Sequence, residues 1–430
     1  MPYDGLTYSE QATRTHELIA DGATTIYEAT FSFDSIFIKI DILHHGENGW
    51  ELYEVKSSTG LKDVYLNDIA VQYHVLSGCG ITPYKAALIH INNKYVRQGN
   101  IEVNKLFTIL DLTGDVRVKQ AEVVSNIAAM RTMLQGDTPQ IDIGPHCSDP
   151  YECSFSGNCW SHITENSVFD FRGHGRPDSF ELYRQGIVSM KDVPPDRLGW
   201  RQTLQLNGLM HQKNVVDADA ISKFLGSLSY PFCFLDFETT YMTPVPLFDG
   251  TRPYQQVPFQ FSLHIIPELG AEAIHYEFLA DGAADPREAF LQQLLAYIPP
   301  AACILTWNQT FEEQRLREMA SAFPEKNNEV QTVIANLRDL MIPFRDKSIY
   351  HWQFNGSYSI KAVLPALVPE LSYETLEVDN GEMAASTWLR IRNESDEEQV
   401  AVLRQQLLEY CHLDTLAMVR ILEKMREISK

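Results

Sequence analysis

The sequence lacks long apolar runs and any basic leader. No apolar run approaches the roughly 20 residues that a membrane-spanning helix needs. The first residues, 1–5, lack the basic and then apolar pattern of a signal peptide. We therefore expect a cytoplasmic protein with no membrane partner. In that compartment its seven cysteines stay reduced or bind metal rather than form disulfides.

The sequence also lacks a basic segment. The formal net charge is −22 at pH 7, and acidic residues outnumber basic ones in each of the segments 1–150, 151–250 and 251–430. This argues against tight, non-specific binding of nucleic acid through many phosphate contacts. An enzyme with carboxylate clusters filled by Mg²⁺ can still act on nucleic acid, because the bound ions dominate the local charge.

The chain is too long for one ordinary core, since it has 430 residues. Hydrophobic residues make up 44% and charged residues 21%, which is typical of a soluble globular protein. The order of strand-like and helical patterns predicts an α/β fold with two modules and a connector of short helices. We expect the domains at 1–164, 165–226 and 227–430. The expected strands lie at 25–33, 36–43, 50–56, 84–91, 230–237, 258–266, 273–279 and 302–306, and the expected helices at 64–76, 116–134, 309–322, 329–340 and 399–426.

A first group of charged residues lies on two apolar strands of the first module. Asp41 is followed after a polar turn by Glu54 and Lys56, which share one face of their strand. Two carboxylates in reach of each other repel unless a divalent cation neutralises them, and a lysine can orient the attacking water. The alternative is a solvent-facing hairpin whose charges alternate by chance. The apolar residues around them favour a metal-dependent site for phosphodiester hydrolysis.

These residues resemble the motif of RecB-like PD-(D/E)XK nucleases. The resemblance implies that Gln72, on the following helix, lies near the site and contacts substrate, although the usual Gln-x-x-x-Tyr is not met because residue 76 is Leu. Tyr73 is adjacent to that glutamine. Glu28 is either an extra acidic ligand or a structural residue.

Three cysteines are evenly spaced in a loop rich in Gly, Pro and Ser: Cys147, Cys153 and Cys159. Thiolates in such loops suit an iron–sulfur cluster or zinc. In the RecB-like group, three such cysteines join one far upstream to hold a structural [4Fe–4S] cluster, with Zn²⁺ as the alternative here. This chain has no cysteine before Cys79. Candidates for a fourth ligand are Cys79, His146 and His162.

A second carboxylate group involves both ends of the second module. Asp236 and Glu238 share one face of an apolar strand, which suits joint ligation of a metal. Near the C-terminus, Tyr410 and Asp414 are spaced i, i+4 on a helix and therefore lie on one face. Between these pairs, Asn308 marks the passage from a strand to a helix.

In this order the motifs resemble DnaQ-like DEDD exonucleases of the tyrosine subtype. Those enzymes carry D-x-E, N-x-x-F-D and Y-x-x-x-D, and this chain has Glu312 in place of the second aspartate. The resemblance implies an RNase H-like fold with two Mg²⁺ or Mn²⁺ ions held by Asp236, Glu238 and Asp414, with Asp339 as a substitute ligand for Glu312. Tyr410 would position the water in an in-line displacement.

A glycine-led polar loop at 356–361 precedes a further helix. Ser359 and Lys361 are candidates for binding a phosphate through backbone amides and charge. An ordinary helix cap is the alternative.

The whole arrangement resembles an uncharacterised bacterial family that joins the two nuclease modules. We expect a metal-dependent 3′–5′ exonuclease with a second nuclease site, acting on DNA or RNA, with a single strand or 3′ end favoured. Two other classes stay open: a nucleic-acid-binding protein that keeps the folds as scaffolds, and an iron–sulfur redox-responsive protein.

Overall fold

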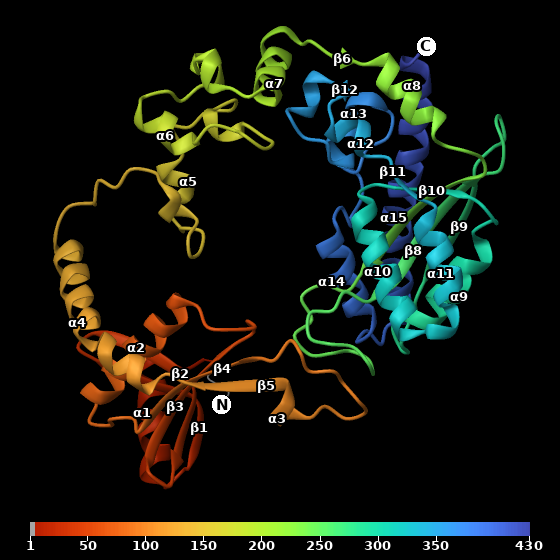
Figure 1. Cartoon of the computed structure of the whole chain (residues 1–430). Coiled ribbons are helices and arrows are strands. Elements are labelled where there is room, and N and C mark those ends of the chain that lie inside the picture. The colour runs from red at the N-terminus through yellow and green to blue at the C-terminus, as the bar shows by residue number, and fades with distance from the viewer. Residues whose placement is uncertain (1–4) are drawn as a thin grey trace. The chain divides into compact units, whose positions relative to one another are not determined.

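The computed structural model describes residues 5–430 and divides into two compact units (Figure 1). Unit 1 is Met1–Cys153 with Thr243–Tyr254, and unit 2 is Ser154–Met242 with Gln255–Lys430. The protein is a mixed α/β structure, as expected from the sequence. No helix within 5–430 is both long enough and apolar enough to cross a membrane.

Unit 1 contains a five-stranded sheet in the order β1-β2-β3-β4-β5. Strands β3 and β4 are parallel, and the other neighbours are antiparallel. The strands are β1 (Thr25–Phe33), β2 (Ile36–Gly46), β3 (Gly49–Lys56), β4 (Lys85–Ile91) and β5 (Phe107–Asp111). The helices are α1 (Tyr8–Ala20), α2 (Asp63–Gly78), α3 (Val103–Leu106) and α4 (Thr113–Gln135), followed by a 3₁₀ turn at Pro145–Cys147.

The core of unit 1 forms where α1, α2 and α4 pack on the sheet. Ile69 and Leu76 of α2 are fully buried against Ile40 and Leu52 of the sheet. The α1 helix begins at a capping box, in which Thr7 and Glu10 satisfy each other's backbone amides. Leu52 and Glu54 point to the same side of β3, so Glu54 faces α2 from within the core.

Unit 2 contains a second five-stranded sheet in the order β11-β10-β7-β8-β9. Strands β7, β10 and β11 run parallel, whereas β8 and β9 are antiparallel to their neighbours. These strands are β7 (Phe232–Thr239), β8 (Pro258–Ile266), β9 (Ile274–Leu279), β10 (Cys303–Thr306) and β11 (Leu337–Asp339). A small separate sheet joins β6 (Val215–Val216) to β12 (Ile349–Tyr350).

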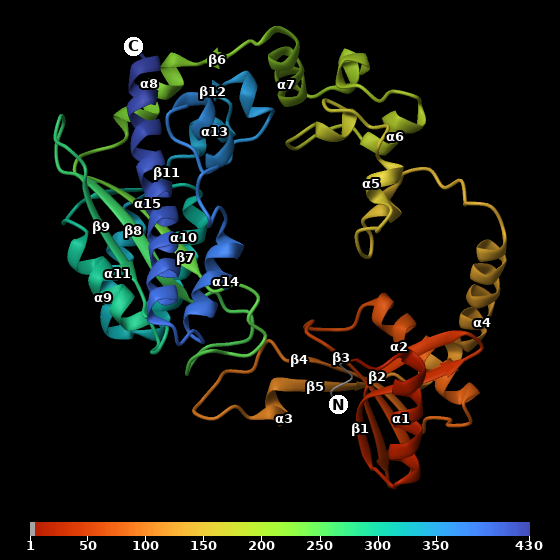
Figure 2. The same cartoon turned by 180° about the vertical axis from the view of Figure 1, so that it is seen from behind.

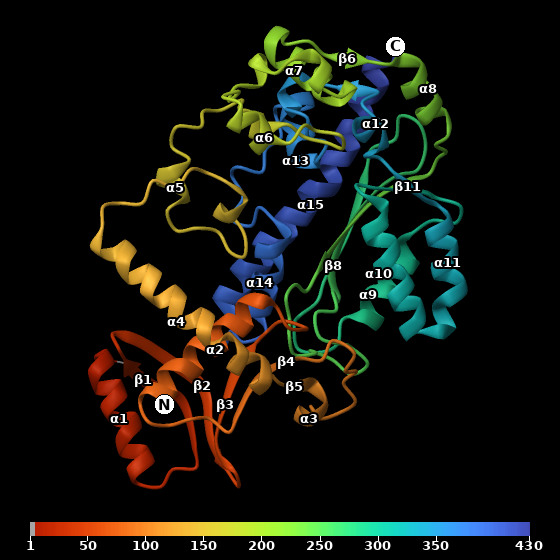
Figure 3. The same cartoon turned by 60° about the vertical axis from the view of Figure 1, so that its left-hand side comes forward.

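Helices cover both faces of the second sheet (Figures 2 and 3). The face that carries Cys233, Leu235 and Phe237 packs on α9 (Arg287–Tyr297), α10 (Gln309–Ala322) and α11 (Asn327–Ala335). The opposite face carries the even-numbered residues of β7 and packs against α14 (Gly381–Ile391) and the long α15 (Glu397–Ile428). One face of β7 therefore packs on α9, α10 and α11, and the other faces α14 and α15.

The remaining elements of unit 2 are short. Before β7 come α5 (Ser156–Cys159), α6 (Ser179–Arg184), α7 (Trp200–His211), α8 (Ala218–Gly226) and 3₁₀ turns at Val168–Asp170, Met190–Asp192 and Pro195–Arg197. Later come α12 (Ile342–Arg345), α13 (Ile360–Leu367) and 3₁₀ turns at Pro324–Lys326 and Trp352–Phe354. Short helices are found between residues 165 and 226, as expected from the sequence.

The expected strands and most expected helices are confirmed within a few residues. The single helix expected at 329–340 is wrong, because α11 ends at Ala335 and β11 follows it. Residues of β11 pair in parallel with β10, which aligns Asp339 with Thr306. Pairing with a sheet edge outweighed the local helical pattern here. Helices α1 and α14 and strand β5 were not expected from the sequence.

Candidate active sites

Two acids of β7 lie on the face of the sheet that α15 covers. Their neighbours Leu235 and Phe237 point to the other face and anchor the strand in the core. The strand is central in its sheet, so its backbone is held from both sides. Asp236 and Glu238 therefore occupy fixed positions beneath α15.

Helix α15 brings a second set of residues to the same place. Cys411 lies 3.7 Å from Asp236, between its Sγ and the carboxylate Oδ2. Oxygens of Asp236 and Glu238 and the sulfur of Cys411 all lie within 4.8 Å of one another. Asp414 follows one turn after Tyr410 on this helix, and both residues are buried. Cys411 was not expected from the sequence, because nothing local distinguishes it from a core cysteine.

Burial raises the pKa of all four carboxyl groups at this site. The pKa of Asp236 is raised well above its usual range by burial and by the charge of Asp414. That of Glu238 is raised by burial and by Asp236 and Asp414. Glu312 shows the same direction, from burial and from Asp236. Burial raises the pKa of Asp414 to about 6, although the hydrogen bond from Tyr373 and the charge of Lys361 act against the rise. The four acids thus form one electrostatically coupled cluster.

Glu312 enters the cluster from the first turn of α10. Asn308 is the N-cap residue of this helix and has a left-handed backbone conformation, with φ 78°. Its backbone N–H donates to the Asp339 carboxylate at 3.2 Å, and that carboxylate also accepts from the N–H of Met341 and lies 3.5 Å from Arg345. Asp339 therefore holds the start of α10 and acts on Glu312 through its charge.

The Glu312 side chain is only 1% exposed, and its Oε2 has no hydrogen-bond partner within residues 5–430. A buried, unpartnered carboxylate oxygen is costly in an apolar medium. A cation beside it would remove that cost. The Glu312 carboxyl is close enough to Asp236 and Glu238 for their charges to act on one another.

A cleft of about 250 Å³ opens over the acids. It is lined by Asp236, Phe237, Glu238, Trp307, Phe311, Ile360, Lys361, Gly381, Tyr410, Asp414 and Met418. A second hollow of about 340 Å³ shares Glu238, Phe311 and Gly381 with the first and extends to Tyr241. Carboxylates, aromatic side chains and one lysine therefore line the same cleft.

Two tyrosines and one lysine surround Asp414. The Tyr373 hydroxyl donates to Asp414 Oδ1 at 2.6 Å, and its ring lies 6.3 Å from that of Tyr410. The Lys361 ammonium lies 5.5 Å from the Tyr373 ring and 5.6 Å from the Tyr410 ring, and it also donates to the carbonyl of Asp379. Tyr373 was missed by the sequence analysis, because its contact with Asp414 arises only in the folded chain.

The two residues expected to bind a phosphate, Ser359 and Lys361, lie in different surroundings at the start of α13. Lys361 lines the cleft, whereas Ser359 is exposed and its hydroxyl lies 3.2 Å from that of Ser357. Ser359 is the N-cap residue of α13, although its side chain makes no capping hydrogen bond. Asn308 is also exposed and is not part of the cleft wall.

The expected residues of unit 1 lie close together at the end of the β2–β3 pairing. The Asp41 carboxylate accepts a hydrogen bond from the N–H of Val55 at 2.7 Å. Glu54 accepts from the Lys56 ammonium at 2.5 Å and from the Gln72 amide at 2.7 Å. Sequence reasoning thus identified four side chains that meet in space, from two strands and one helix.

In the unit 1 group Glu54 is buried, whereas Asp41 and Lys56 are half-buried. Burial raises the pKa of Glu54 to about 7, against the hydrogen bonds from Lys56 and Gln72, and the charge of Asp41 raises it further. Burial lowers the pKa of Lys56, but its bonds to Glu54 and Asp68 raise it more. Asp68 of α2 is therefore an additional member that the sequence analysis did not assign to the site. Tyr73 packs in the core instead.

The cysteines are shared between the units. Cys147 and Cys153 belong to unit 1, where the N–H of Cys153 donates to the carbonyl of Cys147 at 2.8 Å, and Cys159 belongs to unit 2. Cys79 is half-buried and its thiol lies 3.5 Å from the carbonyl of Ser32. The iron–sulfur or zinc cluster stays a prediction.

The donor atoms of both carboxylate groups fit hard divalent cations. Oxygen ligands are those that Mg²⁺ and Mn²⁺ take in proteins. In unit 2 the unpartnered Oε2 of Glu312 and the mutual repulsion of the acids fit such a cation. In unit 1 Lys56 already supplies part of that charge.

A family model and a curated protein each match part of the chain. Residues 233–359 match the family model described as "Domain of unknown function (DUF2779)". The match begins within β7 and covers Asp236, Glu238 and Glu312, and it ends before α15.

One curated relative, "Uncharacterized protein MG366 homolog" from Mycoplasma pneumoniae, is 30% identical over 207 residues. The aligned part covers 44% of this chain and 31% of the relative, so the chain spans about a third of that protein's length. No solved structure matches the chain.

Proposed function

We propose that this protein is a metal-dependent nuclease, and that unit 2 removes nucleotides from the 3′ end of a nucleic acid. The observation that carries the proposal is a group of four carboxyls that act on one another through their charges: Asp236, Glu238, Glu312 and Asp414. Asp236 is half-buried and the other three are buried. A protein that only packed its core would have no reason to bury such charges together. The order of the acidic motifs along the chain adds support, and in this proposal unit 2 has an RNase H-like, DnaQ-type fold.

Asp236, Glu238 and Asp414 would hold the cations, and Glu312 would contribute its free oxygen. Two Mg²⁺ or Mn²⁺ ions, when bound, supply Lewis acidity toward a phosphodiester. Tyr410 lines the cleft, and its hydroxyl would orient the attacking water. Tyr373 holds Asp414 through its hydrogen bond, and Lys361 offers positive charge to the phosphate.

We also propose that unit 1 is a second nuclease site of the PD-(D/E)XK type. Asp41 and Glu54 would bind a cation, and Lys56 would orient water or offset phosphate charge. The contacts of Glu54 with both Lys56 and Gln72 support this role. A solvent-facing hairpin would not keep Glu54 only 4% exposed.

The proposal for unit 2 is tested with Asp236→Ala on a 5′-labelled oligonucleotide in Mg²⁺. We expect stepwise shortening from the 3′ end in the wild type, none in the variant, and unchanged secondary structure by circular dichroism. Glu288→Gln, on the exposed side of α9 across the sheet, is the charge control and should act like the wild type. An unchanged ladder from Asp236→Ala would remove the exonuclease assignment.

A further inference from the structure

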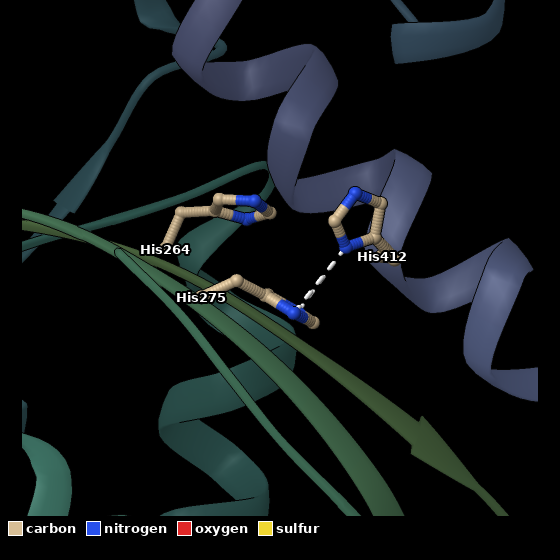
Figure 4. Close-up of side chains that lie close together, drawn as sticks. All are labelled: His264, His275 and His412. Carbon is tan, nitrogen blue, oxygen red and sulfur yellow. Dashed lines mark hydrogen bonds between the residues drawn. The ribbon is translucent and has the colours of Figure 1, made fainter. Parts of the chain in front are cut away.

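Three histidines of unit 2 converge beside the carboxylate cluster, and the nuclease proposal does not use them. His264 is on β8, His275 is its direct partner on β9, and His412 is on α15 (Figure 4). The ring centroids lie 4.4 to 4.9 Å apart. Each ring has a nitrogen within 4.8 Å of a nitrogen of both others.

The spacing of two of these nitrogens is that of ligands around one metal ion. The Nδ1 of His412 lies 3.4 Å from a nitrogen of His275. Two nitrogens at about 2.0–2.1 Å from a tetrahedral Zn²⁺ are separated by roughly 3.3–3.4 Å. A ligand nitrogen of His264 lies within 4.8 Å of ligand nitrogens of the other two rings, which makes a three-histidine group.

Two hydroxyl groups hold the histidine rings in place. Thr415 Oγ1 lies 2.8 Å from His264 Nδ1 and 2.6 Å from Ser262 Oγ, and Ser262 Oγ lies 2.9 Å from His275 Nε2. Thr415 also donates its proton to the carbonyl of His412. When the Thr415 proton is in this bond, the Thr415 oxygen accepts from Ser262 and from His264 Nδ1–H, and Ser262 in turn accepts from His275 Nε2–H.

This proton order assigns one tautomer to each of two rings. The lone pair is left on His264 Nε2 and on His275 Nδ1, the nitrogens that no hydroxyl occupies. Hydrogen bonds to the far nitrogen are the usual way in which proteins orient metal-binding histidines. Burial lowers the pKa of His264 to about 3 and that of His275 to about 4, with further lowering from the neighbouring rings, so both are neutral and able to coordinate near pH 7.

The rings also have access to solvent on one side. A hollow of about 530 Å³ is lined by His275 and His412 and by the carboxylates of Glu277 and Glu409. An ion has a path of entry there, and a water molecule has room to fill a fourth coordination position.

We propose that His264, His275 and His412 form a binding site for a transition-metal ion, Zn²⁺ first, which ties β8 and β9 to α15. Imidazole nitrogens suit Zn²⁺ and not Mg²⁺, so this site and the carboxylate cluster select different ions. The site lies two residues from Asp414 on the same helix and would fix the position of α15 against the sheet. The inference does not rest on the nuclease function.

The test is Zn²⁺ binding to chelator-stripped, full-length protein in excess Mg²⁺, measured by calorimetry and elemental analysis. We expect His275→Gln and His412→Gln each to lose one equivalent of Zn²⁺, and exposed His211→Gln to lose none. Thr415→Val should bind that equivalent roughly 10- to 100-fold more weakly, because the orienting hydroxyl is gone. Zinc X-ray absorption separates this equivalent, with nitrogen and oxygen ligands, from any bound by thiolates.

A second readout is thermal stability. Zn²⁺ at 100-fold above its Kd should raise the Tm of the wild type by roughly 5 °C or more, and leave both histidine variants unchanged. Equal Zn²⁺ stoichiometry and affinity in the wild type and both folded variants would overturn the proposal. The three rings would then be a hydrogen-bonded packing cluster.

Discussion

At the scale of single residues, the buried carboxylates have opposing effects on function and stability. Asp236 and Glu238 are enclosed by the sheet and α15, where an ionised carboxylate is poorly solvated. A residue placed there for packing alone would be neutral. In the proposed site, a bound cation would offset the cost of ionising these side chains.

The pH dependence of stability tests this interpretation at Asp414. Its pKa rises from 3.8 to about 6 on folding, so the folded chain binds this proton more tightly than the unfolded chain. The stability it contributes is complete below about pH 4 and is lost as the pH rises through about 6. The roughly two-unit rise corresponds to about 3 kcal/mol.

Asp414→Asn should therefore melt roughly 5 °C higher than the wild type at pH 8 in EDTA, and the difference should shrink toward pH 4. Differential scanning calorimetry across that range measures it. Mg²⁺ should stabilise the wild type more than the variant. A variant that is less stable at every pH would show that the Asp414 charge is compensated within the folded protein.

At the scale of elements, residues on three sides of α15 contact different parts of unit 2. Tyr410 and Asp414 face the cleft, Cys411 contacts Asp236, and His412 faces β9. Such a helix must keep its rotation about its own axis fixed. Gln260 helps, because its side-chain amide donates to the carbonyl of Leu407 at 2.8 Å and joins β8 to α15.

A substitution of Tyr410 tests whether this residue of α15 is a catalytic group or an aromatic residue of the core. Tyr410→Phe keeps the ring and removes the hydroxyl, so we expect at least a tenfold loss of kcat, about 1.4 kcal/mol in the barrier, with little change in Tm. Tyr373→Phe is the comparison, because it removes a hydroxyl that bonds Asp414. It should weaken Mg²⁺ binding. A large fall in Tm with full activity per folded molecule would make Tyr410 a packing residue.

At the scale of the whole molecule, the two candidate sites share no residue and belong to different units. If both are active, Glu54→Gln should remove one cleavage activity and keep 3′ shortening, and Asp236→Ala should do the reverse. The double variant should be inert. Glu47→Gln, in the turn between β2 and β3, is the control for unit 1.

A panel of single- and double-stranded DNA and RNA with Mg²⁺ and Mn²⁺ provides the measurement. Loss of all hydrolysis in Asp236→Ala alone would make unit 1 a scaffold that binds substrate.

Sequence by itself determined the features that depend on local order. The alternation of β7 is enough to place Asp236 and Glu238 on one face, and the i, i+4 spacing is enough to join Tyr410 with Asp414. The E-x-K pattern of β3 likewise put Glu54 beside Lys56. These relations hold because the repeat of a strand or a helix is a property of the backbone.

Only the tertiary structure decided which residues from distant segments meet. The contact of Tyr373 with Asp414, the role of Asp339 at the start of α10, and the meeting of His264, His275 and His412 span separations that no periodic pattern encodes. The ending of α11 and the formation of β11 belong with these. Such contacts depend on how helices pack on a sheet, and that packing is a balance of burial over the whole unit.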